Sequence, residues 1–221
     1  MKSIYHIGRY FMLMGQVFSR PEKLSIYWKQ TVHEIINLGV SSLGIVLIMS
    51  GFMGAVVTLQ TAAMIDSPLI PLYTVGFTTR QTVILEFSPT VICFVLAGKV
   101  GSNIAGEIGS MRVTEQIDAL EIMGVNSASF LIQPKILAAV FIFPVLITFS
   151  MFTGVLGGWL VSVLTGVVTS YEFNYGVLYD FDAFTVTYAL IKTVVFAFII
   201  TSVSAYYGYF TRGGALEVGR S

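Results

Sequence analysis

The chain has 221 residues, of which 55% are hydrophobic and 11% are charged, whereas soluble domains carry about 25% charged residues. This composition predicts a protein embedded in a membrane. The 12 basic and 12 acidic residues balance, which excludes the positive field that attracts nucleic acid, and the single Cys93 excludes a disulfide framework. Two histidines offer little for a metal site, and the sequence contains no P-loop motif for ATP. We therefore expect no catalytic residue, metal or cofactor of its own in this chain.

Residues 1–34 begin with an amphipathic pattern and are rich in basic residues. The apolar side chains that recur at helical spacing are Ile4, Ile7, Phe11, Met14 and Phe18. The pattern predicts a helix that lies in the membrane interface on the cytoplasmic side. A packed helix of a small soluble domain is the alternative, but no second core-forming segment accompanies it.

Four apolar stretches follow, and each is long enough to cross a hydrocarbon core, which takes about 20 residues. The expected membrane spans are about 36–62, 84–107, 136–166 and 184–210. Residues 35–210 are therefore predicted to form an all-α, polytopic transmembrane domain. Basic residues concentrate in the N-terminal segment, in the 108–135 segment and in the tail, 211–221. Since basic segments stay inside, this distribution predicts that all three are cytoplasmic.

The second span contains a row of small residues. They recur every four positions at Ala97, Gly101, Ala105 and Gly109. Rows of this kind let helix backbones approach closely in lipid, so the row predicts a helix–helix packing surface.

Ionisable residues also lie within the expected spans. Lys99 and Glu107 share one stripe of the second span, where a charge is costly and indicates a water-lined cavity or a substrate path. A central helix whose polar groups are satisfied by its neighbours explains the stripe equally well. For Glu86, near the outer end, an interfacial carboxylate in water is favoured over a buried site. Lys192 of the fourth span either snorkels outward or pairs with a carboxylate of another helix, and the sequence does not decide.

Residues 107–123 form a second amphipathic pattern, between two spans. Val113, Ile117 and Leu120 share one face, charged residues lie on the opposite face, and Gly124 is a stop signal. The pattern predicts a short cytoplasmic helix that docks into a soluble partner, with an ordinary solvated loop helix as an equal alternative.

Three stretches of the sequence together resemble one known family. Residues 86–89 (EFSP), 97–102 (AGKVGS) and 106–120 (GEIGSMRVTEQIDAL) are similar to the central motif of the MlaE/YrbE permeases. These are the membrane subunits of ABC transporters associated with MCE proteins. The resemblance extends over nearly the whole chain.

The resemblance implies a homodimeric permease of the inner membrane that binds separate ABC ATPase subunits, which hold the ATP, and an MCE-domain protein. The implied cargo is phospholipid, moved between the inner and outer membranes to maintain outer-membrane asymmetry. It makes 107–123 the coupling helix. The residues expected to couple to the ATPase are Glu107, Arg112, Glu115, Gln116 and Asp118. The candidates for a lipid cavity are Glu86, Phe87, Arg80 and Lys99.

The sequence departs from the family pattern at two places. Many members have an arginine immediately before the glutamate that Glu86 matches, but this chain has Leu85. We therefore expect lipid to be held mainly by its acyl tails, and any headgroup contact to come from another residue, with Arg80 as the candidate. Members also usually continue into a further hydrophobic span beyond the position of Gly219. Either the sequence is a fragment or this member has lost its last helix, and we favour a fragment.

Two other functional classes are disfavoured. An ion-coupled secondary transporter would use Glu86, Lys99 and Glu107 as a relay, but the chain has few spans and no inverted repeat. An intramembrane enzyme would need a constellation of His, Cys or paired carboxylates, which the sequence does not suggest. The prediction is a non-catalytic transport subunit.

Overall fold

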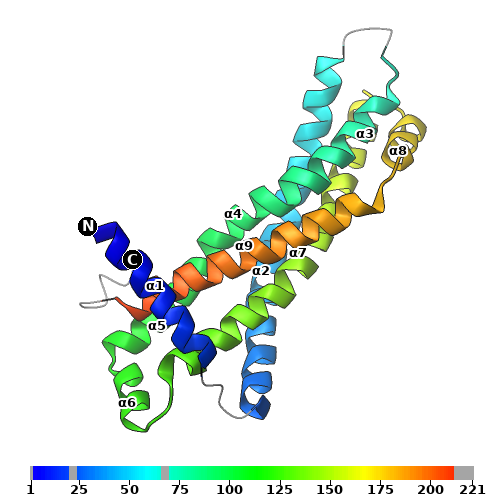
Figure 1. Ribbon diagram of the computed structural model, residues 1–221. Coiled ribbons are helices and arrows are strands. Elements are labelled where there is room, and N and C mark those ends of the chain that lie inside the picture. The colour runs from blue at the N-terminus through cyan, green and yellow to red at the C-terminus, as the bar shows by residue number, and fades with distance from the viewer. Residues whose placement is uncertain (1, 20–23, 66–69, 212–221) are drawn as a thin grey trace. The chain divides into compact units, whose positions relative to one another are not determined.

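The computed structural model describes residues 2–19, 24–65 and 70–211, and these residues are almost entirely helical, with no strand among them (Figure 1). In chain order the helices are α1 (Lys2–Ser19), α2 (Leu24–Met64), α3 (Tyr73–Thr82), η1 (Val83–Val91), α4 (Ile92–Leu96), η2 (Ala97–Gly101), α5 (Ser102–Val113), α6 (Gln116–Ile122), α7 (Ser127–Thr165), α8 (Ser170–Leu178) and α9 (Ala183–Tyr209). The all-α class is confirmed.

By length and composition, 4 helical stretches can cross a membrane. They are Tyr27–Met64, Tyr73–Val113, Ser127–Thr165 and Ala183–Tyr209. Three of them extend well beyond the expected spans, and α3 lies in the interval between the first two expected spans, residues 63–83. Hydropathy marks the part of a helix that suits lipid, whereas the backbone hydrogen bonds of a helix continue through polar residues such as Arg80.

The chain forms two compact units, and α2, α7 and α9 each contribute to both. The first unit contains residues 1–41, 96–142 and 195–221, and the second contains 42–95 and 143–194. Each unit is described by itself below, because the residues that concern function fall into two separate groups.

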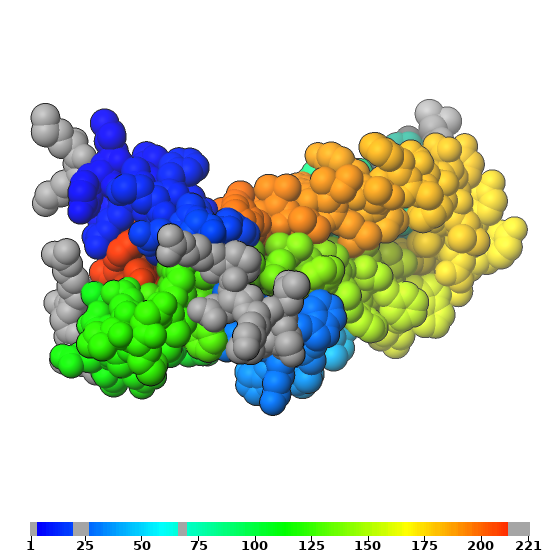
Figure 2. Space-filling view, turned by 60° about the horizontal axis from the view of Figure 1, so that its bottom comes forward, coloured from blue at the N-terminus to red at the C-terminus, as the bar shows by residue number. Residues whose placement is uncertain are grey.

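In the first unit, α1 lies along the C-terminal part of α9 (Figure 2). His6 Nδ1 lies 2.9 Å from the Tyr206 hydroxyl, and the hydroxyls of Tyr10 and Ser202 are 2.8 Å apart. Leu13 and Val17 are buried on this side. The apolar face expected to contact the membrane is exposed at Ile4, Ile7, Phe11 and Phe18, but Met14 is buried and belongs to the packed side. The helix is therefore apolar on two sides.

In the second unit, α2 and α7 cross at glycines. A Cβ atom on Gly54 would overlap the backbone of Gly154, and one on Gly157 would overlap the backbone of Gly51. The same unit holds a chain of buried hydroxyls, in which Ser50 donates to Ser150 at 2.8 Å and Ser150 donates to Ser88 at 3.0 Å. Close backbone contact and interhelical hydrogen bonds are the interactions that hold helices together in lipid.

The second membrane-crossing stretch contains two π-helical segments, η1 and η2. Pro89 lies within η1 and has no backbone N–H to donate, and the N–H of Ile92 donates to the Phe87 carbonyl, five residues back. Wide turns of this kind occur frequently at functional sites. Glu86 lies in η1 and Lys99 in η2.

Candidate functional site

In the second unit, Glu86 forms an ion pair with Lys192. Lys192 of α9 points its Nζ at Glu86 Oε2 at 3.2 Å and also donates to the Leu85 carbonyl at 3.3 Å. The sequence left two alternatives for Lys192, and the structure selects the pairing. The Glu86 side chain is 65% exposed, so its carboxylate is presented outward while the lysine is mostly covered.

The helix that carries Glu86 also presents apolar surface. Phe94 is 72% exposed, and Phe87 is partly exposed. A carboxylate held by a lysine on a helix with exposed aromatic rings is amphipathic. Such a surface suits a molecule that has both a polar headgroup and apolar tails.

Arg80, another lipid-cavity candidate, is buried in the second unit. Its Nη1 donates to the carbonyls of Val177 and Tyr179 at 2.9 and 3.0 Å, and its Nη2 donates to the Asp180 carbonyl at 3.3 Å. Only 3% of the residue is exposed. The guanidinium therefore ties α3 to the end of α8 and to the turn at Asp180, whose φ is +48°. A role for Arg80 in lipid binding stays a prediction.

Lys99, the fourth lipid-cavity candidate, belongs to the first unit, whereas Glu86, Phe87 and Arg80 belong to the second. Its ammonium donates to the Ser41 carbonyl of α2. The structure thus gives Lys99 a partner within its own unit. No ion pair joins it to Glu107 in the described part of the chain, although both lie on the stripe that the sequence indicated.

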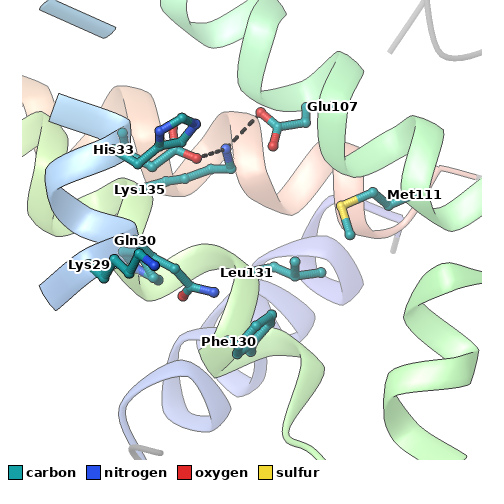
Figure 3. A pocket seen from close by; sticks show the side chains of 10 residues that line it. Lys29, Gln30, His33, Glu107, Met111, Phe130, Leu131 and Lys135 are labelled. Atoms are coloured by element: carbon teal, nitrogen blue, oxygen red, sulfur yellow. Dashed lines mark hydrogen bonds and ion pairs between the residues drawn. The ribbon is translucent and has the colours of Figure 1, made fainter. Parts of the chain in front are cut away.

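A buried lysine in the first unit was missed by the sequence analysis. Lys135 of α7 lies 2.6 Å from Glu34 Oε1 of α2 and 2.7 Å from Glu107 Oε2 of α5 (Figure 3). The Lys135 side chain is 4% exposed, Glu34 is 15% exposed and Glu107 is 47% exposed. One cation thus joins three helices. A signal did exist, because Glu34 and Lys135 each stand immediately before an uncharged stretch, at 35–65 and 136–171.

The prediction of a single continuous coupling helix at 107–123 is wrong. Residues 107–113 are the end of α5, and the chain turns at Thr114 and Glu115 before α6 begins at Gln116. Glu115 adopts a left-handed conformation, with φ +59°, which interrupts the helical hydrogen bonds. The predicted stop at Gly124 is confirmed by its φ of +79°.

An ion pair spans this turn. Arg112 Nη1 and Asp118 Oδ1 are 2.6 Å apart, which holds the end of α5 against α6. Glu121 accepts hydrogen bonds from Ser127 and Tyr209 at 2.9 and 3.0 Å, and Ile117 is fully buried. Helix α6 is therefore attached to α5, α7 and α9. The side chains of Glu115 and Gln116 remain exposed.

In the first unit, one side of the small-residue row packs against α9. A Cβ on Gly101 would meet Ser204, and a Cβ on Gly208 would meet the backbone of Ala105. Gly109 is buried and Ala97 is partly buried. A second row of small residues runs beside the first, at Gly98, Ser102, Gly106 and Ser110. A Cβ added at Gly98 or Gly106 would meet no atom of the described residues within 4 Å.

Comparisons with known proteins give the family. The sequence profile of the permease MlaE family matches residues 31–221. The chain belongs to the MlaE permease family. A Synechocystis protein named "Probable ABC transporter permease protein slr1045" is 34% identical over 221 residues, covering 96% of this chain and 80% of the relative.

Two further relatives extend this similarity. A Rickettsia bellii protein named "Probable ABC transporter permease protein" is 33% identical, covering 97% of this chain and 83% of the relative. The Arabidopsis thaliana "Protein TRIGALACTOSYLDIACYLGLYCEROL 1, chloroplastic" is 30% identical, covering 95% of this chain and 60% of the relative. This MlaE-family chain is thus an ABC transporter permease, a membrane subunit that works with a partner ATPase.

Proposed function

We propose that this MlaE-family permease moves phospholipid between the inner and outer membranes of the cell and so helps to maintain outer-membrane asymmetry. The observation that carries the proposal is the Glu86–Lys192 pair, because it presents a carboxylate on a helix that also exposes Phe94. A lipid is the kind of molecule that can use both surfaces. The name of the Arabidopsis relative refers to a glycerolipid, which also supports a lipid cargo.

The proposed assembly is a homodimer of this chain in the inner membrane, with its N-terminus in the cytoplasm. Two cytoplasmic ATPase subunits bind and hydrolyse ATP, and an MCE-domain protein binds the permease on the outer side. The proposed orientation rests on the basic residues of the N-terminal and 108–135 segments, which stay inside. The exposed apolar face of α1 supports a helix lying in the cytoplasmic interface.

The proposed coupling element is the end of α5 together with α6, in place of one continuous helix. Arg112 and Glu115 are two of its charged residues, and the Arg112–Asp118 pair gives the turn between the helices a fixed geometry. Reversing the charges of Arg112 and Glu115 together is expected to reduce ATPase association while leaving membrane insertion intact. Unchanged association in this double variant would contradict the coupling role.

Lipid is expected to be retained mainly through its tails. Relative to water, each buried CH₂ contributes about 0.8 kcal/mol, whereas an exposed polar contact to a headgroup contributes about 0–1 kcal/mol. The buried position of Arg80, whose guanidinium is occupied by carbonyls, supports weak headgroup recognition at this site.

The proposal is tested by reconstituting the permease with its ATPase and MCE partners in donor vesicles and measuring ATP-dependent transfer of labelled phospholipid to acceptor vesicles. The expected result is transfer that needs ATP and falls in a Glu86→Leu variant. Transfer driven by a proton gradient without ATP would instead support the secondary transporter. A complex that hydrolyses ATP normally but transfers no phospholipid would refute the proposed cargo.

A further inference from the structure

A pocket of about 360 Å³ lies beside the Lys135 cluster, within the first unit (Figure 3). Lys29, Gln30 and His33 line it from α2, Glu107 from α5, and Phe130 and Leu131 from α7. Pockets of roughly this size hold small ligands or parts of larger ones. The known features of the chain give this pocket no role.

The charges of the pocket are mixed. Lys135 already neutralises part of Glu34 and Glu107, since its ammonium lies between their carboxylates. Lys29 and His33 are exposed and, within the described ranges, make no ion pair or hydrogen bond with the protein. The two lysines of the pocket balance its two glutamates, so the pocket does not select a ligand that is purely anionic or purely cationic.

Among the residues that the structure describes, none donates to two of the acceptors in the pocket. The Oε1 atom of Gln30 is buried without a hydrogen-bond partner, which is a costly arrangement unless a ligand or water donates to it. Glu107 is 47% exposed, and only its Oε2 atom is engaged by Lys135. A ligand that brings N–H donors to these two acceptors and a phosphate to Lys29 and His33 would give all four side chains a hydrogen-bond partner.

The pocket lies next to a stripe of exposed apolar residues on α2. Trp28, Val32 and Ile36 are 67%, 40% and 56% exposed and follow at four-residue spacing, so they share one face. Lys29 and His33 each directly follow a residue of this stripe. The uncharged stretch begins at 35, which puts the pocket just outside the hydrocarbon, at headgroup depth. The stripe begins at the same depth with Trp28 and Val32 and reaches the acyl chains at Ile36.

We infer that this pocket binds the headgroup of a zwitterionic phospholipid with a primary ammonium, taken from the leaflet next to the ATPase side. The ammonium donates to Gln30 and Glu107, the phosphate accepts from Lys29 and His33, and the tails lie along the α2 stripe. A quaternary ammonium has no N–H to donate, so the pocket discriminates against choline headgroups. The inference rests on the proposed lipid transport and names a loading site for it, separate from the Glu86 surface.

The test uses the full transporter with its ATPase in nanodiscs of phosphatidylcholine that contain a trace of photoreactive phospholipid. The photoreactive group is placed near the glycerol, and the probe carries either an ethanolamine or a choline headgroup. Crosslinked peptides are then identified by mass spectrometry. The expected result is that the ethanolamine probe labels residues 27–36 and 127–136 about tenfold more than the choline probe, as one charge-assisted hydrogen bond would give.

Two variants probe the pocket without breaking its ion pairs. Gln30→Leu removes the buried acceptor and should lower ethanolamine labelling toward the choline level. Lys29→Met removes a partner of the phosphate, which both probes carry, and should lower labelling by both. Gln60→Leu is the matched control, because Gln60 is an exposed residue of the same helix outside the pocket. Equal labelling by the two probes, or unchanged labelling in Gln30→Leu, would overturn the inference.

A competition arm identifies the source of the headgroup. Unlabelled phosphatidylethanolamine in the nanodisc should compete with the probe, whereas water-soluble glycerophosphoethanolamine should not. Competition by the soluble compound at equal effective concentration would show that the pocket takes a free metabolite and would overturn the lipid assignment. Failure of the proposed function is distinguishable, because ATP-dependent lipid transfer would then be absent even where the pocket is labelled.

Discussion

Lys192 and Glu86 come from different helices, and the ammonium of Lys192 bridges the Glu86 carboxylate at 3.2 Å and the Leu85 carbonyl at 3.3 Å. The lysine therefore contacts both the side chain and the backbone of the π-helical segment η1. This arrangement fixes the direction in which Glu86 is presented. A basic group is thus near this glutamate even though Leu85 occupies the preceding position.

The pair predicts the outcome of a charge swap. Glu86→Lys alone and Lys192→Glu alone should each place like charges together and reduce lipid transfer, while the double variant should recover most of it. Because the Glu86 side chain is 65% exposed, the swap should change the free energy of unfolding by less than about 1 kcal/mol. Transfer assays and thermal unfolding of all three variants measure both effects. A double variant no better than the singles would show that the pairing itself is unimportant.

The Arg112–Asp118 pair predicts a similar swap at the proposed coupling element. Arg112→Glu should free α6 from α5 and lower lipid-stimulated ATP hydrolysis, because motion of the ATPase would no longer reach the membrane helices. Combining Arg112→Asp with Asp118→Arg should restore stimulation. If the combined variant stays uncoupled, Arg112 contacts the ATPase directly rather than acting through Asp118.

The glycine crossing predicts a large effect of one side chain on folding. Gly54→Leu should prevent the native packing of α2 on α7, since even a Cβ atom overlaps the Gly154 backbone. Gly44→Leu is the control on the same helix, because a Cβ there would meet no atom within 4 Å in the part of the chain that the structure describes. Yield and melting temperature of the two variants in detergent measure the difference. Normal folding of Gly54→Leu would mean that α2 and α7 do not approach so closely.

A variant of Arg80 distinguishes a structural role of this residue from a role in lipid binding. Arg80→Ala should leave three carbonyls without their donor, at a cost of about 1–3 kcal/mol for each buried acceptor that water does not reach. Proteolysis or hydrogen exchange in residues 177–182 should therefore increase. A variant that loses bound lipid while this segment stays protected would instead support the lipid-cavity role that the sequence suggested.

Composition and hydropathy were sufficient for the helical class and for the approximate location of the spans, because burial in lipid requires long apolar helices. The exposed face of α1 was also predictable from spacing at Ile4, Ile7 and Phe11. The left-handed Glu115 was not predictable, since a glutamate there carries no turn signal and its conformation depends on the packing of α6.

Pairing between distant residues was also beyond the sequence. Glu34, Glu107 and Lys135 lie far apart in the chain, and the sequence around each of them does not indicate that their charged groups are in contact. The small residues posed a related problem, because two parallel rows, one through Gly101 and one through Gly98, fit the same spacing. Only the fold shows that the Gly101 row is the one packed on α9.

The contact between Gly54 and Gly154 also limits where a lipid can pass. An acyl chain is at least one methylene wide, and the space between α2 and α7 at this level does not admit even one added methyl group. No tail can therefore slip between these two helices while the crossing is intact. A lipid that moves along the second unit must therefore pass over its other faces, because the α2–α7 crossing leaves no gap wide enough for an acyl chain.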